Sequence, residues 1–178
     1  VDERSTVDGL IHTHLNEDQV AAACTYFLSE GIEAVAVCFL HAYANSQHEQ
    51  RAAKIVQKLM PSAYVCTSNE ILPEYREFER FSTTALNAFV APRTGRYLTE
   101  LANNLASSGL NTPVRVMASN GGTWPAARMA ERPVNALLSG PAGGVIAATV
   151  LSEALNIHDI ITYDMGGTST DACRIRNG

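Results

Sequence analysis

The 178 residues carry a net charge of −5, with 46% hydrophobic and 17% charged residues, as in an ordinary globular protein of one or two domains. An acidic chain argues against a nucleic-acid surface, and no apolar run approaches the roughly 18–20 residues that span a bilayer, so neither nucleic acid nor membrane is an expected partner. Four cysteines without a C-x-x-C pair give little support for a zinc or redox site and indicate a reducing, cytoplasmic location.

The start of the chain predicts a hairpin followed by a helix. Asp8-Gly9 stands between two short β-like segments and is typical of a hairpin turn. Asn16 predicts the N-cap of a helix over 17–30, and Gly31 predicts its end. A buried strand over 32–40 follows. The side chains expected to face inward from this first helix are Val20, Cys24, Phe27 and Leu28.

A second helix is predicted to connect this strand to a parallel partner. Ser46-x-x-Glu49 predicts a capping box at the start of the helix, which ends before Pro61. A strand over 63–67 would complete a parallel crossover. The inward side chains of the second helix are expected to be Ile55, Val56 and Leu59.

The middle of the chain is predicted to be helical. A helix over 70–80, interrupted or started near Pro73, precedes helices over 81–91 and 94–108 on either side of Pro92. The apolar stripe expected to face inward comprises Leu86, Phe89, Val90, Tyr97, Leu98, Leu101 and Leu105. A dense charged cluster suggests substrate or interdomain contacts, although a charged helix surface is the ordinary explanation. Its members are Glu74, Arg76, Glu77, Glu79 and Arg80.

The C-terminal third predicts a strand, a helix and a hairpin. The strand covers 113–118 and ends in a turn. Ser139-Gly140-Pro141 predicts the start of a helix over 142–155, since proline is favoured in the first turn. Strands over 160–163 and 172–176 would then form a hairpin.

The two ends of the sequence suggest a piece of a longer protein. The sequence does not begin with methionine, and Asn177-Gly178 is typical of a further hairpin turn. We therefore expect a fold truncated at both ends. The exposed sheet edge expected at Gly178 predicts some self-association.

The residues between the last two strands suggest a phosphate-binding loop. Asp164 ends a β-branched run, and Gly166-Gly167-Thr168-Ser169 follow before Asp171. Consecutive glycines let backbone N–H groups approach an oxyanion, and the hydroxyls add donors. Asp164 could hold Mg²⁺ directly or through water, because Mg²⁺ prefers oxygen ligands shared with phosphates. A Gly-Gly hairpin turn with an incidental aspartate explains the same pattern without a ligand.

Other polar residues allow a functional and a structural interpretation. His41 and His48 flank a loop at the expected carboxyl end of a strand, where they would touch substrate or metal. Alternatively, His48 belongs to the first turn of a helix and His41 packs beneath it. His12 and His14 resemble a metal pair but fit a solvated hairpin face better. Ser139 fits a helix cap better than a nucleophile.

Six stretches carry a family resemblance in chain order. They are residues 37–45 with His48-Glu49, 70–80, 82–90, 119–122, Ser139-Gly140-Pro141-Ala142-Gly143-Gly144-Val145, and 164–171. Together they resemble the hydantoinase A / 5-oxoprolinase family. The resemblance implies an α/β fold with a mixed sheet, parallel crossovers and flanking helices, as part of an actin-like ATPase (ribonuclease H-like) fold. Residues 1–80 would end the family's N-terminal region, and 81–178 would hold a helical connection and the start of its main region.

The resemblance also implies ATP and Mg²⁺ as cofactors. The implied phosphate-site residues are Gly166, Gly167, Thr168 and Ser169, with Gly140 and Gly143 from the preceding helix. Asp164 would hold Mg²⁺, and Asp171 would orient the loop or act on water. A first phosphate hairpin and an adenosine pocket would lie outside this chain, so the isolated chain is expected to be inactive.

The implied reaction opens a cyclic amide of the hydantoin or 5-oxoproline type. Family members phosphorylate the oxygen of a cyclic amide, lactam or ketone with ATP, after which the activated carbon is hydrolysed or carboxylated. The partners implied are this substrate and a hydantoinase B-type subunit or domain. A ketone carboxylase subunit of the same family and a non-catalytic scaffold module remain as alternatives.

Overall fold

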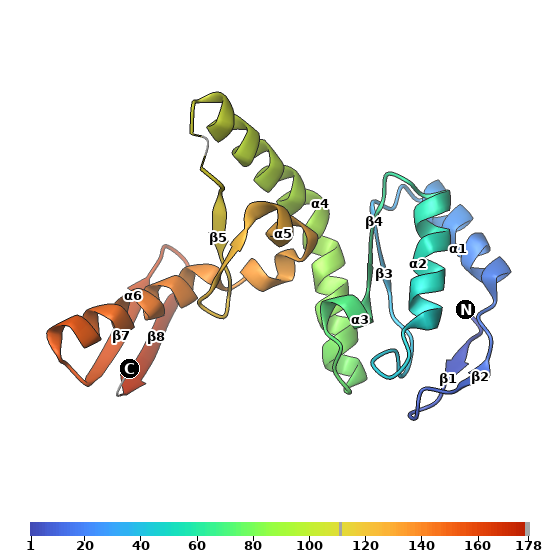
Figure 1. Cartoon of the computed structure of the whole chain (residues 1–178), viewed down its shortest axis with the longest axis horizontal. Helices are drawn as coiled ribbons and strands as arrows, with labels where there is room; N and C mark the ends of the chain where they lie inside the picture. The colour runs from blue at the N-terminus through green and yellow to red at the C-terminus, as the bar shows by residue number, and fades with distance from the viewer. Residues whose placement is uncertain (111, 177–178) are drawn as a thin grey trace. The chain divides into compact units, whose positions relative to one another are not determined.

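The chain folds into two units, Val1–Arg96 and Tyr97–Gly178, in a computed structural model that describes residues 1–110 and 112–176 (Figure 1). About half of the chain is helical. Within the described ranges the strands form four two-stranded sheets, one parallel and three antiparallel. The fold is therefore mixed α/β, but separate strand pairs replace the single mixed sheet that the sequence predicts. The turn predicted at Asn177-Gly178 lies outside the described residues.

The N-terminal hairpin forms as predicted. β1 (Arg4–Ser5) pairs antiparallel with β2 (Ile11–Thr13). Gly9 has a φ of +82° in the turn, a left-handed conformation that costs glycine little. The Thr6 N–H donates to the Leu10 carbonyl at 2.9 Å, so neighbouring residues close this turn.

Helix α1 (Glu17–Ser29) also begins and ends where the sequence indicates. The side-chain oxygen of Asn16 accepts the Gln19 N–H at 3.1 Å, which satisfies one free donor of the first turn. The Gln19 side chain in turn accepts the Asp2 N–H at 2.6 Å. Gly31, with a φ of +66°, ends the helical segment.

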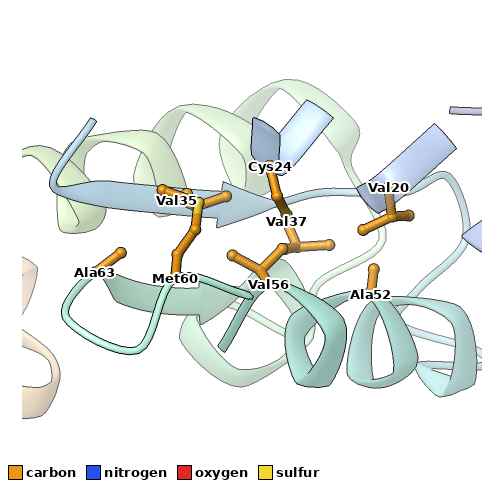
Figure 2. Packing of buried hydrophobic residues seen from close by; sticks show 8 residues of the cluster. All are labelled: Val20, Cys24, Val35, Val37, Ala52, Val56, Met60 and Ala63. Atoms are coloured by element: carbon orange, nitrogen blue, oxygen red, sulfur yellow. The ribbon is translucent and has the colours of Figure 1, made fainter. Parts of the chain in front are cut away.

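The parallel crossover of the first unit is confirmed. β3 (Ala34–Val37) and β4 (Tyr64–Thr67) pair in parallel, and α2 (Gln47–Leu59) connects them. The strand expected over 32–40 is shorter than predicted. Figure 2 shows the apolar cluster between α1, β3 and α2, which comprises Val20, Cys24, Val35, Val37, Ala52, Val56, Met60 and Ala63.

Two residues predicted to face inward are exposed instead. Leu28 is 56% exposed and Leu59 is 40% exposed. Met60 takes the inward place beside the end of α2 and is only 2% exposed. It follows Val56 by four residues, one helical turn on, and therefore lies on the same face.

The capping box predicted at Ser46-x-x-Glu49 is wrong. Ser46 is the N-cap residue of α2, but its side chain makes no capping hydrogen bond. Glu49 is fully buried and accepts hydrogen bonds from the N–H groups of Phe39, which follows β3, and Asn69, which follows β4. Those distant donors satisfy its carboxylate, so Glu49 is not available to the start of its own helix.

A long helix follows a break at the predicted place. α3 (Ser68–Ile71) ends before Pro73, and α4 (Glu77–Ser107) runs on with Pro92 inside it. The predicted apolar stripe is wrong at three positions, because Leu86, Phe89 and Tyr97 are 43%, 78% and 62% exposed. The side chains that face inward from the same stretch are Thr84, Asn87, Ala88 and Ala91.

In the second unit, the end of α4 is followed by an antiparallel pair that the sequence predicts only in part. β5 (Arg115–Met117) pairs with β6 (Thr123–Pro125), which was not predicted. α5 (Ala126–Glu131) and a 3-10 helix (Pro133–Ala136) follow. A small core joins them to the end of α4 and comprises Leu98, Ala118, Ala126 and Met129.

The unit ends with α6 (Ser139–Leu155) and a hairpin of β7 (Asp159–Met165) and β8 (Thr170–Arg176), as predicted. In Figure 1, α6 lies along this hairpin. The capping role predicted for Ser139 is wrong, because Leu138 is the N-cap residue and its N–H is held by the Ser119 hydroxyl at 3.1 Å. No helix in the described ranges is both long and apolar enough to cross a membrane.

Candidate functional site

The glycine-rich turn lies at the tip of the β7–β8 hairpin. The Gly166 N–H donates to the Ser169 carbonyl at 2.9 Å and closes a four-residue turn. All four residues of the turn are exposed. Its backbone N–H groups beyond Gly166 are therefore open to an approaching anion, as the phosphate-loop interpretation requires.

Asp164 and Asp171 lie directly opposite each other, one pair before the end of the ladder. Successive strand residues alternate between the two faces, so this pair shares a face with Ile175, which is 7% exposed beneath α6. The opposite face carries Ile161 and Met165, both exposed. Both aspartates therefore belong to the α6 side of the hairpin.

The start of α6 and the aspartate pair share one pocket of about 320 Å³. Pro141, Gly144 and Val145 contribute its helical wall, and Asp164 and Asp171 lie on its strand wall. The structure thus brings together the two glycine-containing motifs that the sequence singled out.

Several of the predicted phosphate-site residues do not line this pocket. Gly166, Gly167, Thr168 and Ser169 form the turn beside it, and Gly140 and Gly143 lie on other faces of α6. A Cβ on Gly143 would meet the Met117 side chain at 3.9 Å, so this glycine packs against β5. Gly144, which was not among the predicted residues, lines the pocket instead, and the phosphate contacts of Gly140 and Gly143 stay a prediction.

The pocket is also lined by strand residues that the sequence did not indicate, Thr162, Cys173, Tyr163 and Ala172. Thr162 and Cys173 face each other two residues further from the turn than the aspartates, and Gly144 faces them from α6. The alternation of the strands would have identified the first two, because residues two apart share a face.

Opposed carboxylates favour a cation between them. Side chains directly opposite in an antiparallel pair have Cβ atoms roughly 4.5–5.5 Å apart, and like charges there repel. Mg²⁺ is commonly held by one or two carboxylates together with substrate phosphates. No group of three or more His, Cys, Asp or Glu in the described part of the chain could hold a metal. A Mg²⁺ ion at this pair would need further oxygen ligands, such as those of a bound phosphate or of water.

The contacts and exposure of the histidines agree better with the structural interpretations given for them than with a metal site. His48 lies in the first turn of α2 with its Nδ1 2.8 Å from a Glu3 oxygen, and both side chains are buried. His41 has a φ of +56°, and its ring packs edge-on against Tyr43 at 5.9 Å between centroids. His12 is exposed, as a solvated hairpin face predicts.

One member of the charged cluster is deeply buried, so its assignment to a helix surface is wrong. The Arg80 guanidinium donates to the Ser68 hydroxyl at 3.0 Å and to the carbonyls of Phe39 and Glu74 at 2.9 Å each. The Ser68 hydroxyl donates to Glu49. Burial raises the pKa of Glu49, while these hydrogen bonds oppose the rise.

This Glu49–Ser68–Arg80 network lies where the chain leaves β3 and β4. Glu49 also accepts the Phe39 N–H at 2.8 Å and the Asn69 N–H at 2.9 Å. Arg80 lies over the Tyr43 ring at 5.5 Å from its centroid. The network fixes both strand ends to α4, and no signal within a short sequence window could have identified it.

Comparison with known protein families gives a consistent result. Residues 80–178 match the family described as Hydantoinase/oxoprolinase. Residues 1–60 match the family described as Hydantoinase/oxoprolinase N-terminal region. The two matches together cover most of the chain, in the order that the sequence resemblance predicts.

Individual relatives extend this comparison. The chain is 39% identical to caprolactamase subunit alpha of Pseudomonas jessenii over 96% of its own length and 25% of that protein. The structure of the ATP-dependent caprolactamase from the same organism matches 97% of this chain and 25% of its own, with a TM-score of 0.87 and 38% identity. Nucleotide-free acetone carboxylase, studied for ATP-dependent acetone carboxylation, matches 98% of this chain and 25% of its own, with a TM-score of 0.88 and 31% identity.

A third relative is the 5-oxoprolinase of Saccharomyces cerevisiae, which is 32% identical over 92% of this chain and 12% of that protein. The chain thus spans about a quarter of the length of the caprolactamase subunit and the acetone carboxylase chain. Because the Hydantoinase/oxoprolinase match alone covers residues 80–178, more than half of the sequence, the chain belongs to the hydantoinase/oxoprolinase family.

Proposed function

We propose that the chain forms part of an ATP-dependent amidohydrolase subunit that opens a cyclic amide of the hydantoin or 5-oxoproline type. The observation that carries the proposal is the position of Asp164 and Asp171, opposed beside an exposed Gly-Gly turn and over a pocket shared with α6. Two relatives, caprolactamase and 5-oxoprolinase, are named for lactam substrates, which supports a cyclic amide.

The proposed fold of the whole protein is that of an actin-like ATPase, with β7–β8 as its second phosphate hairpin. The exposed turn and the adjacent helix start support this assignment. In this proposal residues 1–80 end the N-terminal region of the family, and residues 81–178 hold a helical connection and the start of its main region. A first phosphate hairpin, an adenosine pocket and a hydantoinase B-type partner would come from outside this chain, which is why we expect the isolated chain to be inactive.

The proposed chemistry assigns one task to each part of the site. Backbone N–H groups of Gly166 and Gly167 and the Thr168 and Ser169 hydroxyls would donate to the phosphates, and Asp164 would hold Mg²⁺ directly or through water. Mg²⁺, when bound, would neutralise charge on the transferred phosphoryl group. Asp171 would orient the turn or position water.

Phosphorylation solves the central difficulty of amide hydrolysis, which is that an amide carbonyl is a poor electrophile. The carbonyl oxygen attacks the γ-phosphorus and ADP leaves. Water then adds to the activated carbon, and the ring C–N bond breaks as its nitrogen takes a proton, which leaves an acyl phosphate. A second water attacks the acyl carbon, and the phosphate departs with the former carbonyl oxygen. Positioning and charge neutralisation are the protein's main contributions to such a transfer.

The test places this chain in the corresponding quarter of the caprolactamase alpha subunit and measures ATP-dependent caprolactam hydrolysis. Asp164→Asn should lower turnover by about 100-fold or more, as loss of a charge-stabilising group in an active site does. Asp159→Asn is the matched control, because Asp159 lies on the same strand at its far end, exposed, near Arg174. Unchanged turnover in Asp164→Asn would remove Asp164 from the mechanism.

A ketone carboxylase subunit of the same family is the second candidate, because the acetone carboxylase structure matches as well as the caprolactamase one. ATP consumption with lactams alone, or with ketones and bicarbonate, separates the two. A folded chimera that consumes no ATP with either substrate class supports the scaffold alternative.

We also propose a cytoplasmic location for the protein and some self-association of the isolated chain. The four cysteines are free thiols, which supports a cytoplasmic location. Within the described ranges, β7 and β8 pair only with each other, so each keeps an open edge and self-association of the isolated chain stays a prediction.

A further inference from the structure

A second polar pocket lies in the first unit, between the end of β2, the start of α1 and the first turns of α2. Its volume is about 460 Å³, within the range of roughly 300–1,000 Å³ typical of small-molecule sites. Ile11 and Leu15 give it an apolar wall, and the polar residues that line the rest are His14, Glu17, Gln47, His48, Gln50, Arg51 and Lys54. None of these residues belongs to the β7–β8 site.

His48 is held in a fixed orientation at this pocket. Its Nδ1 lies 2.8 Å from Glu3 Oε2, and the two side chains are only 7% and 6% exposed. A carboxylate accepts hydrogen bonds, so Nδ1 carries the hydrogen. In the described part of the chain Nε2 has no hydrogen-bond partner, and no unpartnered side-chain nitrogen or oxygen there is sealed from solvent. Nε2 is therefore the polar atom that His48 offers to the pocket.

One cation that lines the pocket has no carboxylate partner in the part of the chain that the structure describes. Arg51 holds Glu17 with two hydrogen bonds of 2.7 and 2.8 Å, and this pairing lowers the pKa of Glu17. The Glu3 carboxylate accepts the Nδ1 hydrogen of His48. Lys54, three residues beyond Arg51 on the same helical face, has no carboxylate partner within the described ranges.

We propose that this pocket binds the phosphate group of a small phosphorylated molecule. Lys54 and the positive end of α2 would attract the anion, and a phosphate can both accept from an N–H and, when singly protonated, donate to Nε2 of His48. A carboxylate only accepts. The pocket is larger than a phosphate ion, and its Ile11–Leu15 wall would hold the attached carbon skeleton.

The test follows the imidazole nitrogens of the full chain by ¹H–¹⁵N NMR during titration with inorganic phosphate, at constant ionic strength and about pH 7. We expect a saturable shift of His48 Nε2 with a dissociation constant on the order of 1 mM. Lys54→Gln should weaken binding about fivefold or more. Lys58→Gln, on the same helix but outside the pocket, should bind as the parent chain does.

Two comparisons distinguish the ligand class. Glycerol phosphate should bind at least as tightly as inorganic phosphate, because it also uses the apolar wall. The proposal is overturned if His48 shows no saturable shift, if acetate binds as tightly as phosphate, or if Lys54→Gln binds unchanged. Lys54 is exposed, so its variant should keep the fold, which far-UV circular dichroism verifies.

Discussion

Replacing Arg80 by methionine should destabilise the first unit strongly, because Arg80 is a buried charge with three fixed acceptors. The guanidinium donates to the Ser68 hydroxyl and to the carbonyls of Phe39 and Glu74, all at 2.9–3.0 Å. Its removal leaves both carbonyls unpaired and takes the nearby positive charge away from buried Glu49.

The expected loss in unfolding free energy is about 3–5 kcal/mol, the range found when one partner of a buried charge pair is removed. Each lost charged hydrogen bond contributes roughly 1.5–3 kcal/mol, and relief from burying the guanidinium offsets part of the sum. Because the unfolding free energy of a whole domain is only about 5–15 kcal/mol, this loss should clearly lower the urea concentration at the midpoint of unfolding.

Urea unfolding followed by far-UV circular dichroism provides the measurement, with Arg76→Met as the matched control. The Arg76 side chain is 75% exposed and its only ion-pair partner within the described ranges is Glu79 at 3.9 Å, so its loss should cost no more than about 0.5 kcal/mol. The loss in unfolding free energy for Arg80→Lys should lie between those of the other two variants, because an ammonium cannot donate to the three acceptors in the fixed geometry of a guanidinium. If Arg80→Met costs less than about 1 kcal/mol, the network does not hold the strand ends together.

Further predictions concern the core, the thiols and the pH dependence. Met60→Ala should cost about 2–5 kcal/mol in urea unfolding, whereas Leu59→Ala, at an exposed position, should cost less than about 1 kcal/mol; equal costs would contradict the assigned core. Burial raises the pKa of Cys38 to about 12, so at about pH 8 only about one thiol in 10,000 is ionised, and mass spectrometry after brief iodoacetamide treatment should find Cys173 labelled first and Cys38 protected. Burial raises the pKa of Glu49 above its unfolded value of 4.5, so its contribution to stability is present below that pH and is lost as pH rises through the folded pKa. The stability difference between the parent chain and Glu49→Gln should therefore be larger at about pH 4 than at about pH 8, and a difference that grows with pH would contradict the shift.

Features formed by neighbouring residues were predictable from the sequence. The hairpin turn at Asp8-Gly9 closes between Thr6 and Leu10, and the cap of α1 joins Asn16 to Gln19. Both depend on backbone geometry and donors within a few positions, which is the information a short sequence window contains. The hairpin of β7 and β8 belongs to the same class, because its turn spans four residues.

Features formed between distant residues were not predictable in this way. Glu49 stands at a position typical of a capping box, yet its carboxylate bonds Phe39, ten residues earlier, and Ser68, nineteen residues later. Arg80 reaches back 41 residues to the Phe39 carbonyl. Isolated in sequence, both look like solvated charges of amphipathic helices, and only the meeting of β3, β4 and α4 turns them into buried partners.

The candidate phosphate site combines both kinds of information. Once the turn is limited to 166–169, antiparallel pairing sets Asp164 opposite Asp171 without any tertiary contact. Which face of α6 meets that pair depends on packing, and a helix advances about 100° per residue, so adjacent glycines cannot share one role. Pro141, Gly144 and Val145 follow the i, i+3, i+4 spacing of a single face, and this face lines the pocket. A Cβ on Gly144 would meet nothing within 4 Å, so packing does not require a glycine at this position. The absence of a side chain there instead leaves the pocket open beside the aspartates.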